Sequence, residues 1–175
     1  MMIPEIKAGV CILTNQESGA AFNAISLYVL DRYLKASHDW LGALSTVVAR
    51  MDSATKAREG SIMTSRAADS SPSLPVEKYA GTYRDAWYGD ITITQEQSKL
   101  VIRFTKTPDL VADLEHWQYD TFVAKWRDRE LRADAFFTFS LNPDGSIEHA
   151  KMKAVSPATD FSFDFHHLEL KPVGE

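Results

Sequence analysis

From Leu74 onward, apolar residues recur at every second position, and this period constrains the fold more than any other feature. Alternate residues of a β-strand face opposite sides, so each such run predicts a short strand with one buried face. The runs cover residues 91–94, 100–104, 116–123, 137–141, 147–155 and 161–165. An Asn-Pro-Asp-Gly turn at 142–145 predicts a hairpin. With an aromatic-rich first strand within 74–88 and a last one near 168–170, about eight short antiparallel strands are expected.

Eight short strands in about 100 residues favour a closed up-and-down barrel or a sandwich. Closure is attractive because it leaves no exposed sheet edge. The interior of an eight-stranded barrel holds side chains or one small ligand. After Phe165 the apolar phase shifts to Leu168 and Leu170, which predicts a β-bulge or corner at His166 and His167.

The first 59 residues follow other patterns. The continuous apolar run 9–13 predicts a strand covered on both faces, with Cys11 as a buried thiol. Helical spacing then runs from a Ser18 cap to about residue 36, and a second helix follows an Asp39 cap and ends near residue 58. Residues 60–73 are small and polar, as in a linker. The predicted fold is therefore mainly β, with one strand and two helices (1–59), a linker (60–73) and a barrel (74–175).

Charge and composition exclude several classes of protein. A net charge of -5 gives no basic face for nucleic acid. No apolar run is long enough to predict a membrane-spanning helix. Glu5 and Lys7 interrupt the start of the chain where a signal peptide would need an apolar core, so the compartment is not assigned. One cysteine permits neither an internal disulfide nor a cysteine-based zinc cage.

Two pieces of the chain carry a resemblance to a known family. GVCILTNQESGAAFNAISLYVLDRYL (9–34) resembles the last strand and closing helix of serine β-lactamase-like hydrolases, the class C β-lactamase and penicillin-binding-protein-related family. LPVEKYAGTYRDAWYGDITI (74–93), with HWQYDTFVAKWRD (116–128) and DFSFDF (160–165), resembles the lipocalin-like domain of unknown function appended to many of them. The resemblance implies that 1–59 is the end of a hydrolase domain and 74–175 a lipocalin-like barrel. It also implies a family that is often periplasmic or exported.

The same resemblance implies which catalytic motifs to look for. The family uses Ser-x-x-Lys, Tyr-x-Asn or Ser-x-Asn, and a Lys/His-Thr-Gly strand. This chain has no Tyr-x-Asn, and its Lys106-Thr107-Pro108 lacks the glycine. Ser53-Ala54-Thr55-Lys56 matches the first motif literally, but it falls at a helix end, where a solvated face is the simpler interpretation. No catalytic residue is therefore predicted.

The candidate ligand-binding residues are aromatic. Tyr and Trp supply flat apolar surface with one polar group, which suits a small-molecule site. Seven of them could line a barrel cavity or, alternatively, simply fill the core: Trp87, Tyr88, Trp117, Tyr119, Trp126, Phe137 and Phe163.

No metal site or cofactor is predicted. His166 and His167 are adjacent, so on a strand their rings would point to opposite faces. A metal site would need His116 or His149 to converge with one of them, together with a carboxylate such as Asp164. Nothing in the sequence indicates that convergence.

Three functions remain open. The chain is a non-catalytic accessory part of a serine β-lactamase-like hydrolase, with the barrel packing beside the catalytic domain, assisting it or binding its substrate. Alternatively, it is a free-standing lipocalin-like binder of a small apolar ligand. The third is an interaction module, in which residues 9–34 lack the sheet they would cover and fold onto the barrel or pair two copies as a homodimer.

Overall fold

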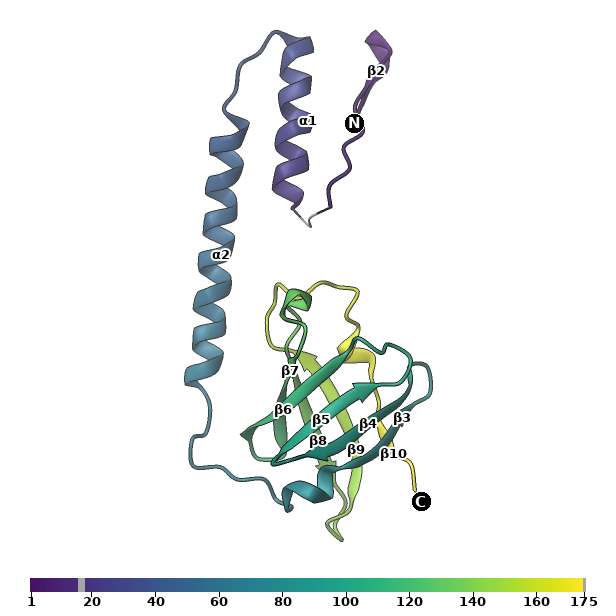
Figure 1. The fold of residues 1–175 in the computed structure, drawn as a ribbon. Coiled ribbons are helices and arrows are strands. Elements are labelled where there is room, and N and C mark those ends of the chain that lie inside the picture. The colour runs from purple at the N-terminus through teal and green to yellow at the C-terminus, as the bar shows by residue number, and fades with distance from the viewer. Residues whose placement is uncertain (16–17, 175) are drawn as a thin grey trace. The chain divides into compact units, whose positions relative to one another are not determined.

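The computed structural model describes residues 1–15 and 18–174 (Figure 1). Gln16 and Glu17, which fall within the predicted segment 9–34, and Glu175 lie outside the described residues. The chain divides into two compact units, Met1–Ala57 and Arg58–Glu175. Each unit is described by itself.

The first unit is a small hairpin followed by helix. Its elements are β1 (Met2–Ile3), the 3-10 turn η1 (Pro4–Ile6), β2 (Ala8–Gly9), α1 (Gly19–Leu34) and the start of α2 (Trp40–Thr64). Both predicted helix caps are confirmed. The Ser18 hydroxyl accepts from the Ala21 amide at 3.4 Å, and the Asp39 carboxylate accepts from the Gly42 amide at 2.8 Å. Neither helix, within the described residues, combines the length and hydropathy needed to cross a bilayer.

The prediction of a strand at 9–13 is wrong. Ile3 pairs with Ala8 and Met2 with Gly9, and Val10 still exchanges two hydrogen bonds with Met1, at 2.9 and 3.0 Å. The partner segment ends at Met1, and since a strand needs a neighbour for its backbone groups, the strand does not continue through residues 11–13. Cys11 is exposed rather than buried, because only one side of the run is partly covered: Val10 and Ile12 are half-buried, whereas Cys11 and Leu13 face solvent.

Helix α2 continues to Thr64, beyond the predicted end near residue 58, and the residues after it contact the barrel. Ile62 packs with the apolar cluster that contains Trp117. Arg66 donates through Nε to the Trp117 carbonyl at 2.6 Å, and its guanidinium lies 5.6 Å from the Trp117 ring centroid. The Ser73 amide and hydroxyl both donate to the Asp120 carboxylate, at 2.9 and 2.8 Å. The polar residues expected to form a linker are therefore hydrogen-bonded to residues 117–120 of the sheet.

The second unit contains an eight-stranded antiparallel sheet, which confirms the predicted fold class (Figure 1). Its order is β10-β3-β4-β5-β6-β7-β8-β9, so from β3 to β9 each strand pairs with the next in sequence. The strands are β3 (Gly81–Asp85), β4 (Gly89–Glu96), β5 (Lys99–Phe104), β6 (Val111–Gln118), β7 (Thr121–Trp126), β8 (Ala135–Leu141), β9 (Ile147–Ala154) and β10 (Lys171–Pro172). Three 3-10 turns accompany them: η2 (Val76–Tyr79), η3 (Arg129–Leu131) and η4 (Phe165–His167).

The C-terminal segment brings the two ends of the sheet together and makes a nearly closed barrel. Leu170 exchanges two backbone hydrogen bonds with Ala150 of β9, at 2.7 and 3.1 Å. The next residue, Lys171, pairs with Arg84 of β3. One short segment thus bridges the first and last strands of the meander.

The inward-facing residues form one apolar core. Cross-strand partners such as Ile93 with Ile102 and Phe122 with Phe137 place large side chains opposite each other. Trp126 is 1% exposed, and its indole N–H donates to the Ala133 carbonyl at 2.6 Å. A buried indole with its polar atom satisfied is stable in such a core.

Two predicted strands are wrong in detail. The alternation at 116–123 spans two strands, because β6 ends at Gln118 and β7 begins at Thr121. Residues 161–165 do not form a strand, because the Asp160 carboxylate and carbonyl accept the amides of Ser162 and Phe163 and hold a turn. The hairpin predicted at 142–145 is confirmed by the bond from the Gly145 amide to the Asn142 carbonyl at 2.9 Å.

Candidate functional site

The loop between β3 and β4 is the local structure on which the candidate site is built. Asp85 pairs with Gly89, which leaves a three-residue loop at 86–88. Gly89 has φ of 80°, the left-handed conformation that such a loop needs after its turn. The Asp85 carboxylate accepts the amides of Trp87 at 2.7 Å and Tyr88 at 2.8 Å. The Asp85 carboxylate therefore fixes the conformation of the loop that carries Trp87 and Tyr88.

The same carboxylate ties the loop to the C-terminal segment. Its second oxygen accepts the Glu169 amide at 2.8 Å, and Asp85 is only 6% exposed. Burial by itself opposes ionisation, but the amides of Tyr88, Glu169 and Trp87 together outweigh it and lower the pKa of Asp85 below its ordinary value. A charged carboxylate thus holds two segments that are far apart in the sequence.

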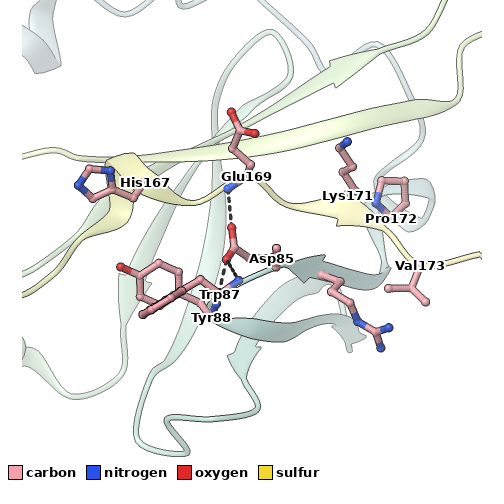
Figure 2. Close-up of a pocket in the computed structure, with 10 residues that line it drawn as sticks. Asp85, Trp87, Tyr88, His167, Glu169, Lys171, Pro172 and Val173 are labelled. Carbon is pink, nitrogen blue, oxygen red and sulfur yellow. Dashed lines mark hydrogen bonds between the residues drawn. The ribbon is translucent and has the colours of Figure 1, made fainter.

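A groove of about 830 Å³ opens on the surface between these two segments (Figure 2). Aromatic and charged side chains of both signs line it, with Trp87 and Tyr88 on one segment and His167, Glu169 and Lys171 on the other. Arg84, Ala86, Pro172 and Val173 also contribute. Trp87 is 88% exposed, so its indole offers most of its surface to a ligand. Figure 2 shows the Asp85 hydrogen bonds that hold this arrangement.

Of the seven predicted aromatic residues, only Trp87 and Tyr88 line this groove. Trp126 and Phe137 are buried in the main core. Phe163 is partly buried and packs against the edge of that core, 5.4 Å from the Phe165 ring.

Trp117 and Tyr119 belong to other surfaces. Trp117 packs with Val123, Val155 and Phe136 in a second cluster, separate from the main core. Tyr119 is exposed in the β6–β7 turn. In an antiparallel meander successive turns alternate between the two ends of the barrel, so this turn lies at the opposite end from the β3–β4 loop. The seven residues therefore do not converge on one site.

Three possible metal ligands lie together beside the groove, without the His116 or His149 that a metal site was expected to require. Asp164, His166 and His167 are all exposed, and their potential metal-ligating atoms lie within 4.8 Å of one another. The expectation that the two histidines face opposite sides is wrong, because they lie on the 3-10 turn η4 rather than on a strand. His116 and His149 do not join them. The first bonds to the Tyr119 carbonyl, and the second lies beside Glu148.

The literal Ser-x-x-Lys match is placed in the interior of α2. The Ser53 hydroxyl donates to the Ala49 carbonyl at 2.8 Å and is exposed on the helix. A nucleophilic serine needs an adjacent base or a helix N-terminus to stabilise its alkoxide. Its position on the helix supports the interpretation of Ser53 as a solvated side chain.

Comparison with known proteins places the barrel in a family. The sequence model of a family described as "Domain of unknown function (DUF3471)" matches residues 65–172. The chain belongs to this family. DUF3471 thus covers the strands from β3 to β10 and also takes in the polar residues after α2. A search of curated proteins found no match.

The solved structures include one similar chain, the C-terminal domain of penicillin binding protein Rv0907. It has 21% sequence identity and a TM-score of 0.45, over 62% of this chain and 94% of that one.

Proposed function

We propose that this DUF3471 chain is the non-catalytic accessory part of a serine β-lactamase-like hydrolase. In this proposal, Met1–Ala57 packs against a catalytic domain of that class and the barrel is the appended domain. The resemblance of residues 9–34 to the closing strand and helix of such domains supports it.

The observation that carries the proposal is that the first unit buries almost none of its side chains. Among its described residues, Asp31 is the only buried one. Large apolar side chains of its two helices are instead exposed: Phe22, Ile25, Tyr28, Tyr33, Leu34, Leu41, Val47, Val48 and Met51. Exposing this many large apolar side chains to water is unfavourable and indicates that the helices are covered by a partner.

Hydrogen bonds fix the corner between α1 and α2, which makes the exposed surface of the two helices suitable for docking. The buried Asp31 carboxylate accepts from the His38 amide and the Trp40 indole, each at 2.9 Å, and its Oδ2 lies 3.0 Å from the His38 ring nitrogen. Burial opposes ionisation, but the bonds from His38 and Trp40 prevail and lower the pKa of Asp31. The corner between α1 and α2 is thus held by charge-assisted hydrogen bonds.

Size-exclusion chromatography with light scattering tests the docking. The purified chain, mixed with the catalytic domain of a class C β-lactamase-like hydrolase from the same genome, is expected to form a 1:1 complex. Ile25→Glu with Tyr28→Glu should abolish the complex, because both side chains are exposed on one side of α1 and a buried charge is costly. Arg50→Glu, an exposed charge change on α2, is the matched control and should leave it intact.

Two results would contradict the docking proposal. The first is a homodimer that forms through the same face and excludes the hydrolase domain, which would favour the interaction module. The second is a monomer whose α1 amides resist hydrogen exchange without any partner, which would mean that the helices need no cover.

The groove favours a second candidate, binding of a small ligand at the barrel surface. The barrel interior is occupied by large side chains such as Tyr79, Trp126 and Phe137. The exposed Trp87 indole, by contrast, lies in a groove that Arg84 and Lys171 also line. This chemistry suits an aromatic or apolar ligand with an anionic group.

A fluorescence titration with 8-anilinonaphthalene-1-sulfonate tests this second candidate, since the probe carries both chemical features. Trp87→Ala is expected to raise the Kd by about tenfold, as for the loss of an aromatic contact worth ~1.4 kcal/mol. Tyr119→Ala removes an exposed aromatic side chain at the other end of the barrel and should leave the Kd unchanged. Equal affinities for the wild type and Trp87→Ala would rule out the groove as the site.

A further inference from the structure

The turn η4 gathers three metal-ligating side chains on one side of the chain. A 3-10 helix has three residues per turn, so the residues at positions i and i+3, here Asp164 and His167, lie one above the other. His166 lies beside them, and the centroids of the two imidazole rings are 3.9 Å apart. All three side chains are exposed, and their potential ligand atoms lie within 4.8 Å of one another.

The backbone under this cluster is anchored in the barrel core. Phe165 follows Asp164 and Leu168 follows His167 in the chain, and the two are only 4% and 3% exposed. The Phe165 ring stacks on the buried Trp126 ring, with centroids 5.8 Å apart and an interplanar angle of 17°. The His167 amide donates to the Asp164 carbonyl at 3.0 Å and closes the turn. Binding of a metal ion therefore requires side-chain rotation but no rearrangement of the backbone.

The Asp164 carboxylate is also oriented from the groove. The Tyr88 hydroxyl donates to Asp164 Oδ2 at 3.3 Å. Within residues 1–15 and 18–174, no lysine, arginine or histidine forms a salt bridge with Asp164. A hydrogen bond from a neighbouring residue, here from Tyr88 to Asp164, is typical of metal-ligating carboxylates.

We propose that Asp164, His166 and His167 form a Zn²⁺ site beside the groove. Two imidazole nitrogens and one carboxylate oxygen are a ligand set that zinc uses when one position stays open to water or a ligand. Tetrahedral bonds of 2.0–2.2 Å place ligand atoms about 3.3 Å apart, so the present spacing closes by a small rotation of the side chains. Nothing in this proposal depends on the docking or the groove ligand proposed above.

Isothermal titration of the untagged full-length chain with Zn²⁺ tests the site, after removal of metal with a chelator. One ion per chain is expected. His166→Gln and His167→Gln should each raise the Kd by about tenfold or more, and the double variant should lose the site. Tyr88→Phe, which removes only the outer hydrogen bond, should raise the Kd by about tenfold. Because both histidines are exposed, these variants should keep the far-ultraviolet circular dichroism of the wild type.

Two control variants make the titration specific. His149→Gln removes a histidine that also lies beside a carboxylate, that of Glu148 at 3.3 Å, and should leave the Kd unchanged. Cys11→Ser removes an exposed thiol, which could bind zinc by itself, and should also leave it unchanged. Unaltered binding by the His166→Gln/His167→Gln double variant would overturn the site. So would the absence of zinc binding by the wild type at millimolar Zn²⁺.

Discussion

Replacing Trp126 by alanine should lower the free energy of unfolding by about 3–5 kcal/mol, the range for loss of a large buried aromatic side chain. The indole is 1% exposed, stacks on Phe165 and meets the Phe104 ring edge-on with centroids 5.8 Å apart. Its removal leaves a cavity and also leaves the buried Ala133 carbonyl without the indole N–H. Urea unfolding followed by circular dichroism measures the change.

Two further variants separate the causes of that loss. Trp126→Phe keeps an aromatic ring but loses the hydrogen bond and part of the volume, and should lower the free energy of unfolding by about 1–3 kcal/mol. Trp87→Ala changes an exposed tryptophan and should stay within about 0.5 kcal/mol of the wild type. A loss below 1 kcal/mol for Trp126→Ala would show that the interior is not close-packed around the indole.

The second large effect is expected at Asp85. Asp85→Ala should lower the free energy of unfolding by about 2–4 kcal/mol, because three backbone amides lose a charged acceptor at once. The change should also loosen the groove, since the Trp87 loop is then no longer tied to Glu169. Asp109→Ala, at an exposed turn, is the matched control and should stay within about 0.5 kcal/mol.

The effect of Asp85 should depend on pH in a defined direction. Its pKa is lowered in the folded state, so the unfolded state binds the proton more readily. The stabilisation is therefore complete well above the ordinary value of 3.8 and is lost as the pH falls through the folded pKa. The difference between wild type and Asp85→Ala should be constant from about pH 5 to 7 and shrink below about pH 4. A difference that grew on acidification would contradict this assignment.

The sequence predicted the antiparallel barrel because its apolar period is strict where strands face the core. It could not locate the β6–β7 turn. A two-residue turn shifts the alternation by one residue, but the register irregularity between His116 and Gln118 shifts it back. Trp117 and Val123 therefore remain in phase although they lie on different strands. Only the left-handed backbone of Tyr119, with φ of 48°, marks the reversal, and tyrosine gives no signal of it.

The candidate site was only partly predictable, because alternation identifies a strand but not the surroundings of each face. Trp87 and Tyr88 were named among the aromatic residues, yet the groove depends on Asp85, which reads in the sequence as an ordinary exposed charge. The sequence predicts a strand at 161–165 and a β-bulge or corner at His166 and His167, because the apolar phase shifts from Phe165 to Leu168 and Leu170. The turn that starts at Asp160 breaks that strand and brings Asp164 to His166 and His167.

The closure of the barrel by Leu170 and Lys171 also bears on chain entropy. Every pairing from β3 to β9 joins neighbouring strands, so each brings together residues that are close in sequence. The pairing of Lys171 with Arg84 instead joins residues from opposite ends of the domain. The entropy lost in closing a loop rises with its length. The pairing of Lys171 and Pro172 with β3 therefore costs more chain entropy than any other pairing in the sheet. The rest of the sheet has the low contact order of a simple meander.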